Sequence, residues 1–258
     1  MPEKKEKAVE QKYQFPSETV DLPSGGKVYG KDSPLYSGKI DIKYMTAKEE
    51  DILTSQNLIK KGVVIDKVLD SLILTKGISV DDLLMGDKNA VMVAARILAY
   101  GPEYQCKITH PSTGQEVSHV FNLTECEFKK PEGGELINNS FEFELPATKA
   151  KITFKLLTGK EENLIIQEVK NIKKIGTQIS PDLTTRLRHQ IQSINGDDSK
   201  ATINNFVENM LSRDSFALRK EVLRVSPDID MTQEIEIEGD TVEVVIPMTV
   251  GFFWPDFQ

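Results

Sequence analysis

The chain carries one fifteen-residue segment twice, and this duplication limits what it can fold into. Residues 39–53 read KIDIKYMTAKEEDIL, and residues 151–165, 112 positions later, read KITFKLLTGKEENLI. Seven of the fifteen positions are identical, whereas unrelated segments of ordinary composition would share about one. A repeat of this period is one structural unit used twice, not a short solenoid motif. We therefore predict two homologous modules, and scaffolding or interaction becomes the first functional hypothesis.

Each copy of the segment predicts a strand that leads directly into a capped helix. Residues 40–44 and 152–156 alternate apolar and polar side chains, which is the period of a half-buried strand. A Thr with a Glu three positions later follows each strand, and this is the pattern of a helix capping box. The pairs are Thr46 with Glu49 and Thr158 with Glu161.

A second carboxylate, Glu50 or Glu162, follows each capping Glu and favours the positive end of the helix dipole. Two adjacent carboxylates could instead be paired catalytic acids. Capping already explains why Glu49 and Glu161 stand where they do. We therefore expect all four carboxylates to be structural.

Beyond this segment the duplication continues with looser matching. Each copy is expected to contain an amphipathic helix and then a further helical face. The first face consists of Ile65, Val68, Leu69 and Leu72 in one copy and of Leu183, Leu187, Ile191 and Ile194 in the other. The second face consists of Val91, Ala94, Ala95 and Leu98, and of Ile203, Phe206, Val207, Met210 and Leu211.

A pair of strands is predicted at the end of each copy, after Pro102 and Pro227. Apolar alternation and turn residues favour hairpins, since a Gly-Asp pair between alternating strands is a hairpin signal. The paired segments are 104–110 with 116–123, and 234–238 with 241–248. Strand, helices and hairpin in each copy indicate an α+β fold whose helices pack on one sheet.

The length of 258 residues, with 39% hydrophobic content, lets two domains of ordinary size each bury a core. The first repeat is predicted over 20–130 and the second, with an aromatic C-terminus, over 141–258. Residues 131–140 are expected to be a linker, because a polar, Pro/Gly-rich stretch lies at the junction. The charged residues 1–19 predict a disordered or partner-ordered arm.

Charge argues against a nucleic-acid partner. The chain has 32 basic and 40 acidic residues, and residues 131–258 hold 14 of the basic and 21 of the acidic ones. No basic stripe is available to neutralise phosphates. Glu234, Glu236 and Glu238 place three carboxylates on one side of a predicted strand. They form either a solvated face that discourages edge-to-edge pairing or a dock for a basic partner.

The sequence shows neither an apolar stretch long enough to span a bilayer nor a signal-peptide core. We therefore expect a soluble chain that is made in a cytoplasm. In that compartment two cysteines, Cys106 and Cys126, are expected to be free thiols.

One group of residues could bind a metal: Cys106, His110, His119 and Cys126 lie within 21 residues around one predicted hairpin. Their spacing is not a standard zinc pattern, so side chains that face solvent or the edge of the core are favoured. His189 is expected to stand alone on a helix surface. A Ser/His/Asp spacing, a phosphate-binding glycine loop and a His-Glu-x-x-His motif are all missing from the sequence, and residues 22–26 read as a turn. We expect neither catalysis nor a cofactor.

The strongest candidate contact site is the C-terminal stretch 251–257, which holds four aromatic residues, including the only Trp. Chain ends usually fray, so this aromatic group must be buried somewhere. It either docks on the sheet of its own copy or anchors a partner, as aromatic hot spots do. The candidate partner-binding residues are Phe252, Phe253, Trp254, Pro255 and Phe257.

Four segments together resemble the T-even-type bacteriophage baseplate protein family. They are DLPSGGKVY at 21–29, the strand and helix at 40–53, FVENML at 206–211 and GFFWP at 251–255. The resemblance covers most of the chain beyond residue 20. Relatives often carry Cys-Pro-x-Cys-Gly knuckles in their hairpins. Here HPSTG at 110–114 and EIEG at 236–239 stand in their place, which further disfavours zinc.

The resemblance implies a non-enzymatic protein of the virion tail baseplate, associated with the hub and its assembly and made in the host cytoplasm. It could be a permanent component, present in several copies of a symmetric assembly, that acts as an adaptor between hub or wedge subunits. It could also be an assembly chaperone that holds hub or tape-measure protein and then leaves. A distant alternative is a metal-dependent enzyme that uses the 106–126 cluster. Rigidly capped repeats favour the component, since transient holders more often expose flexible grooves.

Overall fold

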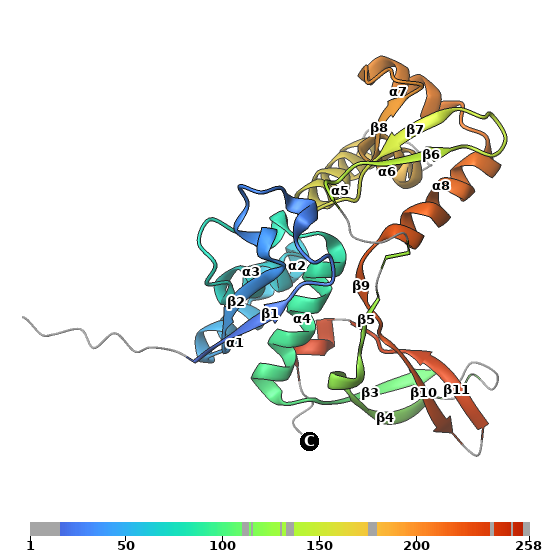
Figure 1. The fold of residues 1–258 in the computed structure, drawn as a ribbon. Helices are drawn as coiled ribbons and strands as arrows, with labels where there is room; N and C mark the ends of the chain where they lie inside the picture. The colour runs from blue at the N-terminus through green and yellow to red at the C-terminus, as the bar shows by residue number, and fades with distance from the viewer. Residues whose placement is uncertain are drawn as a thin grey trace, which may run out of the picture.

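The computed structural model describes residues 16–109, 114, 116–129, 131–132, 137–174, 180–237, 240–248 and 250–254. Its helices and small antiparallel sheets confirm the predicted α+β class. Figure 1 shows two lobes of helices and strands, with two hairpins near the first lobe. The connections between the lobes include two short paired strands, β5 (Phe128–Lys129) and β9 (Asp228–Ile229).

The first lobe is built on two antiparallel strands, β1 (Ser17–Asp21) and β2 (Lys39–Lys43). Four helices follow: α1 (Ala47–Leu53), α2 (Gln56–Lys61), α3 (Val64–Leu72) and α4 (Met85–Tyr100). Short 3-10 turns, η1 (Lys27–Tyr29), η2 (Pro34–Ser37) and η3 (Val80–Asp82), lie between these elements. The apolar face predicted on the third helix is buried at Val68, Leu69 and Leu72. Ile73, directly after this helix, forms a bridge back to Ile42 of β2.

Strand β1 was not anticipated, and it corrects part of the predicted arm. Residues 17–19, which were assigned to that arm, pair with β2, and the Thr19 hydroxyl donates a 2.6 Å hydrogen bond to Asp41. Residues 1–15 lie outside the described residues. The ladder therefore extends the ordered first lobe to the N-terminal side of residue 20.

The second lobe contains a three-stranded antiparallel sheet in the order β6-β7-β8. Its strands are β6 (Phe141–Glu144), β7 (Lys151–Phe154) and β8 (Ile191–Ile194). Its helices are α5 (Gly159–Lys174), α6 (Asp182–Gln190), α7 (Lys200–Glu208) and α8 (Ser212–Val225). The apolar side chains of the sheet, among them Ile152 and Phe154, lie in the core of this lobe.

The predicted helical face of 183–194 is wrong in its second half. Helix α6 ends at Gln190, and Ile191 and Ile194 lie in strand β8 instead. Pairing with β7 and a turn at Asn195-Gly196, both with positive φ, replace the expected helical turn. β-Branched residues fit a pleated, half-buried surface well, so tertiary pairing overrides the helical period here.

Two further differences concern the last helices. Helix α7 ends at Glu208, so Met210 and Leu211 lie beyond the helical face to which they were assigned. Helix α8 follows at once and was not predicted from the sequence.

Both predicted hairpins are confirmed. Strands β3 (Glu103–Thr109) and β4 (Glu116–Asn122) pair in the first, and β10 (Thr232–Ile237) and β11 (Asp240–Val245) in the second. The two hairpins, drawn in green and red in Figure 1, lie side by side. The Gln233 side chain joins them by donating a 3.0 Å hydrogen bond to the Asn122 carbonyl.

The largest hydrophobic cluster crosses the predicted division of the chain. It unites apolar side chains from 22–123 with others from 229–253. A second cluster combines Val28 and Leu84 of the first lobe with residues 145–225. The repeat boundaries at 20–130 and 141–258 remain a prediction, while side-chain packing joins the C-terminal hairpin to the first lobe.

Two glycines allow close approach between segments that are distant in sequence. A Cβ added to Gly86 of α4 would lie 1.9 Å from the Pro227 carbonyl oxygen. A Cβ on Gly159, at the start of α5, would lie 3.0 Å from the Asp81 Cα. The Gly159 amide also donates a 2.9 Å hydrogen bond to the Leu83 carbonyl. These contacts fix α5 against the segment that precedes α4.

In the part of the chain that the structure describes, no helix is both long enough and apolar enough to cross a membrane.

Candidate interaction surfaces

The carboxylate of Glu49 caps its helix and forms a buried ion pair. The Thr46 amide donates a 2.9 Å hydrogen bond to Glu49 Oε2, and Lys43 Nζ lies 2.7 Å from Oε1. Burial acts to raise the pKa of Glu49, but hydrogen bonds from Lys43 and Thr46 outweigh it and hold the pKa at about 2. Such a carboxylate remains ionised near neutral pH and serves the fold.

The second copy repeats this arrangement at positions 112 higher. The Thr158 amide donates a 2.8 Å hydrogen bond to Glu161 Oε2, and Lys155 pairs with Oε1. The neighbouring Glu162 forms a two-pronged ion pair with Arg186. The strand-to-helix junction is thus common to both copies, while homology of the complete modules stays a prediction.

The DLPSGGKVY segment closes onto the start of α4 through a fully buried carboxylate, Asp87. Asp87 accepts hydrogen bonds from the Ser24 amide at 2.9 Å, from the Ser24 hydroxyl at 2.6 Å and from the Tyr29 hydroxyl. The Tyr29 oxygen in turn accepts from the Leu84 amide at 2.8 Å. Burial raises the pKa of Asp87 despite these donors. The segment therefore serves as a structural clasp in the first lobe.

The metal candidates are only partly brought together. Cys106 lies directly opposite His119 in the first hairpin, and the Cys126 thiol lies 3.7 Å from the Gln233 amide nitrogen. Burial raises the pKa of both thiols. Within the described residues no three His, Cys, Asp or Glu side chains gather as a metal site would require, and His110 falls outside them.

His189 does not stand alone as expected. Its Nε2 atom lies 3.1 Å from Glu168 Oε2, and Arg188 approaches the same carboxylate at 3.8 Å. The contact joins α6 to α5. These three residues also line an open hollow of about 650 Å³ beside α7. His189 and Glu168 are 21 positions apart in sequence, so no local pattern indicated that they would pair.

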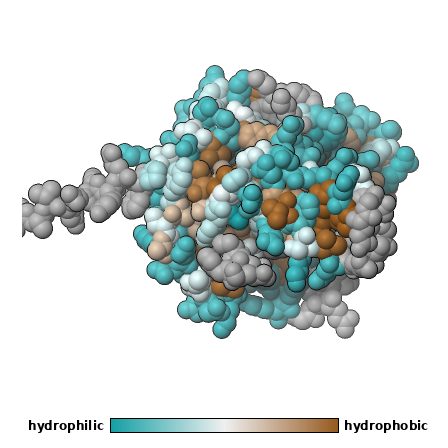
Figure 2. Space-filling view, turned by 90° about the horizontal axis from the view of Figure 1, so that it is seen from below, coloured by the Kyte–Doolittle hydropathy of each residue, from teal (hydrophilic) through white to brown (hydrophobic). Residues whose placement is uncertain are grey.

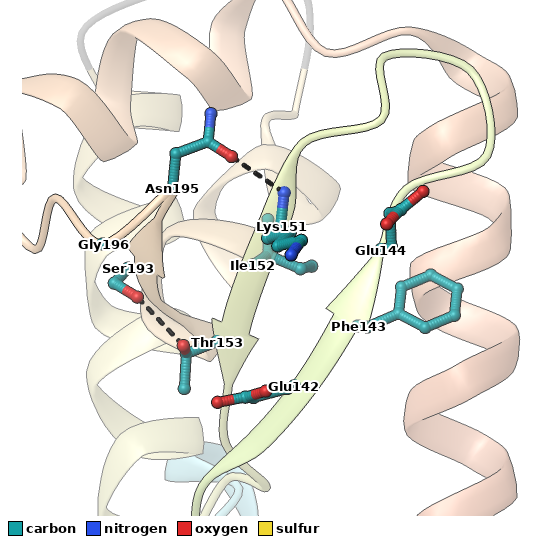
Figure 3. Close-up of a pocket in the computed structure, with 9 residues that line it drawn as sticks. All are labelled: Glu142, Phe143, Glu144, Lys151, Ile152, Thr153, Ser193, Asn195 and Gly196. Carbon is teal, nitrogen blue, oxygen red and sulfur yellow. Dashed lines mark hydrogen bonds between the residues drawn. The ribbon is translucent and has the colours of Figure 1, made fainter.

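A second hollow, of about 530 Å³, lies on the exposed face of the β6-β7-β8 sheet (Figure 3). Its polar groups bond to one another: the Ser193 hydroxyl donates to Thr153 Oγ1 at 2.9 Å, and Asn195 accepts from the Lys151 amide at 2.9 Å. Figure 3 shows Phe143 pointing toward a neighbouring helix, away from these groups. The lining is that of a hydrated sheet face.

The C-terminal aromatic residues are buried against the first half of the chain. Phe252 and Phe253 are 0% and 1% exposed, and the Phe252 ring meets Tyr104 of β3 edge to face at 4.9 Å. Trp254 is partly buried. Pro255 and Phe257 lie outside the described residues. Docking thus extends beyond the sheet of their own copy to elements of the other one.

A buried arginine holds this segment in place. Arg96 of α4, 3% exposed, donates to the Phe252 carbonyl at 2.9 Å, to Gly101 at 3.2 Å and to Glu103 at 3.3 Å. Its guanidinium also lies 5.8 Å from the centre of the Tyr104 ring. Backbone carbonyls and aromatic faces replace a carboxylate as its partners.

Helix α8 presents an exposed face that is both apolar and basic, here called the α8 face. Its members are Ser212, Arg213, Phe216, Arg219, Lys220, Leu223 and Arg224. Phe216 is 58% and Leu223 64% exposed. Arg219 and Lys220 lie 5.8 and 6.0 Å from the centre of the Phe216 ring. None of these exposed members is acidic: Asp214 is buried, and the carboxylates of Glu221 and Glu132 neutralise Arg224 at one end of the face.

The second hairpin presents a face of opposite charge, here called the acidic hairpin face. Glu234 lies directly opposite Glu243, and Glu236 lies on the same exposed side. Val245, 69% exposed, completes the face. The third carboxylate predicted here, Glu238, is outside the described residues. On the side of the molecule seen in Figure 2, apolar groups are separated by polar residues.

Comparison with known families identifies the family to which the chain belongs. A family model described as T4 bacteriophage base plate protein matches residues 15–254. The chain belongs to this family. The match includes both copies of the repeated segment, the clasp and the C-terminal aromatics up to Trp254. No curated protein and no solved structure matches the chain.

Family membership makes this a structural protein of the phage tail baseplate, where it contacts other baseplate proteins. It confirms the resemblance of the four sequence segments. Sequence reasoning missed the α8 face, although Leu218, Val222 and Val225 follow the spacing of a helix that buries one side.

Proposed function

We propose that this baseplate protein is a permanent virion component that acts as an adaptor between neighbouring subunits in or near the hub. Its support is the presence of two exposed faces with opposite charge, on α8 and on the β10–β11 hairpin. An adaptor needs two surfaces that bind two neighbouring subunits, and opposite charges let each surface select a complementary one.

Rigidity between the two faces supports the same function. The link from α8 to β10 runs through Pro227, against which Gly86 of α4 packs, and through β9, which pairs with β5. Close approach at Gly86 and Gly159 leaves little room between the packed segments. A preorganised chain loses less conformational freedom on binding, which suits long-lived contacts.

Particle proteomics tests this proposal. Purified virions are expected to contain the chain in a fixed ratio to other baseplate proteins. Absence from complete particles, combined with presence in assembly intermediates, would overturn the component proposal. That result would favour the second candidate, an assembly chaperone, which the exposed apolar residues Phe216 and Leu223 support as a holding surface for hub or tape-measure protein.

The C-terminal aromatics add a narrower proposal. Phe252 and Phe253 are engaged inside the chain, so Trp254 is the described aromatic residue of this segment with surface left for a partner. Trp254→Ala is expected to reduce incorporation into particles and cross-linking of the segment to a neighbour. Unchanged assembly and solubility would refute the anchor.

The metal-dependent alternative has its own test. Cys106 and His119 are adjacent, but burial raises the pKa of the Cys106 thiol, which disfavours the thiolate that binds zinc. Elemental analysis of the purified protein is expected to find no stoichiometric zinc. Stoichiometric zinc that is lost in Cys106→Ser would revive this alternative.

A further inference from the structure

The α8 face and the acidic hairpin face match each other in charge. Arg213, Arg219 and Lys220 have no ion pair with any carboxylate in the described part of the chain. Glu234, Glu236 and Glu243 likewise have no cationic partner among those residues. Each face therefore carries the charge that the other lacks. These charges are not satisfied by each other within one molecule.

The two faces also match in length and in apolar content. Helix α8 has 14 residues, which corresponds to about 21 Å at the rise of an α-helix. Strand β10 has six residues, or about 20 Å at the rise of an antiparallel strand. Val245 stands exposed on the hairpin, and Phe216 and Leu223 stand exposed on the helix. A two-stranded ribbon can thus cover the whole helix.

The hairpin gives a reason of its own for a basic partner. Glu234 and Glu243 are directly opposite across the strands, and like charges in that position destabilise a sheet. Their mutual repulsion is relieved when a cationic surface covers them. If this face only met solvent, a pair of opposite charges at positions 234 and 243 would make the hairpin more stable.

We propose that the acidic hairpin face of one copy docks on the α8 face of a second copy of this chain. In each chain the two faces are joined through β9, and they come from different elements (Figure 1). Two copies can satisfy both faces at once in a two-fold dimer, or successive copies can join head to tail into a ring or an open filament. This inference rests on the adaptor proposal, because it names a second copy as the partner of the same two faces.

Sedimentation velocity on the purified full-length protein tests the contact. Self-association is expected to strengthen with protein concentration and to weaken with added salt, since exposed charges are screened. The double variants Arg219→Glu/Lys220→Glu and Glu234→Lys/Glu236→Lys are each expected to lower the association constant roughly 100-fold. An equimolar mixture of the two variants is expected to associate again, because each then supplies the face that the other has lost.

Two matched controls separate this contact from a general charge effect. Lys60→Glu/Lys61→Glu on α2 and Glu142→Lys/Glu144→Lys on β6 make the same charge changes at exposed pairs elsewhere. Both controls are expected to associate like the wild type. If a reversal variant fails to fold, the neutral versions Arg219→Gln/Lys220→Gln and Glu234→Gln/Glu236→Gln replace it. They are expected to weaken association in the same direction.

A wild type that stays monomeric at every concentration overturns the inference, as does association that survives both reversals. Loss of association in the controls as well overturns it too, since the effect would then follow net charge alone. The adaptor proposal is tested separately, by measuring the amount of this chain in purified virions. A monomer that is stoichiometric in virions sinks the copy-to-copy contact but leaves the adaptor proposal standing.

Discussion

Single residues in the repeated junction show how burial and hydrogen bonding compete. Glu49 is fully buried, yet its pKa lies near 2 because Lys43 and Thr46 stabilise the ionised form. Glu161 has its pKa lowered in the same manner: burial opposes the shift, and hydrogen bonds from Lys155 and Thr158 outweigh it. Both carboxylates tie stability to pH.

The first prediction concerns acid sensitivity. Because the folded pKa of Glu49 is below its ordinary value of 4.5, its contribution to stability is complete above that value and is lost as pH falls toward 2. Its total contribution is at most about 3 kcal/mol. Glu49→Gln is expected to unfold at lower urea at pH 7 and to lose less stability than the wild type between pH 5 and pH 3. Equilibrium urea unfolding measures both effects, and Glu50→Gln, an exposed neighbour, is the control.

The second prediction concerns the clasp. Tyr29→Phe removes the hydroxyl that bridges Asp87 and the Leu84 amide. Unpaired buried groups then cost about 1–3 kcal/mol, which a lower denaturation midpoint would show. Tyr36→Phe is the matched control, because the Tyr36 hydroxyl has no hydrogen bond among the described residues. Equal stability of the two variants would contradict the role of the clasp.

The sequence predicted side-chain interactions well where the two partners are close together in the chain. The Thr-x-x-Glu pattern predicted both caps, because cap and carboxylate lie on the same helical turn. The partners Lys43 and Lys155 stood identical in both copies, but their pairing needed the geometry of the strand end. Asp87 gave no local signal, since its donors lie about 60 residues away.

At the scale of elements, the alternation of apolar and polar residues along the chain predicted β2, β7 and the hairpins. Strand β6 reads Phe-Glu-Phe-Glu, an alternation that could have revealed it. Strand β8 could not be separated from a helix by its period, because only its pairing with β7 decides between them. Strand β1 likewise depends on β2 for its order.

The third prediction concerns the approach of α4 to β9. Gly→Ala inside a helix ordinarily stabilises by about 1 kcal/mol. Gly86→Ala is expected instead to destabilise by about 2 kcal/mol or more, because its Cβ would meet the Pro227 oxygen at 1.9 Å. Gly159→Ala, with a nearest atom at 3.0 Å, is expected to cost less. Thermal unfolding compares the two, and a Gly86→Ala protein at least as stable as the wild type would refute the close contact.

The whole molecule is arranged by contacts that no local pattern predicts. The hairpin of the second half and the C-terminal aromatics share a core with the first lobe. Arg96 and Phe252 are 156 positions apart, yet a hydrogen bond joins them. The sequence indicated that the aromatics must be buried, but it could not say against which elements.

The fourth prediction follows from this core. Removing residues 250–258 is expected to raise amide hydrogen exchange in α4 and β3, because Phe252, Phe253 and the Arg96 contact are lost. Exchange in β7 and α6 is expected to stay unchanged, since they belong to the other hydrophobic cluster. Removing only 255–258 is the control, because it leaves Phe252, Phe253 and the Arg96 contact in place. Uniform loss of protection across both lobes would contradict the division of the core.

The burial of Phe252 and Phe253 against α4 and β3 has a consequence for synthesis. A ribosome makes the first lobe early, but the last side chains of its core are translated more than a hundred residues later. The core of the first lobe therefore stays incomplete until Phe252 and Phe253 have been translated. A message cut short by a nonsense codon would yield a fragment with exposed apolar surface, which cellular proteases degrade readily. Only copies that extend through Phe253 would then accumulate.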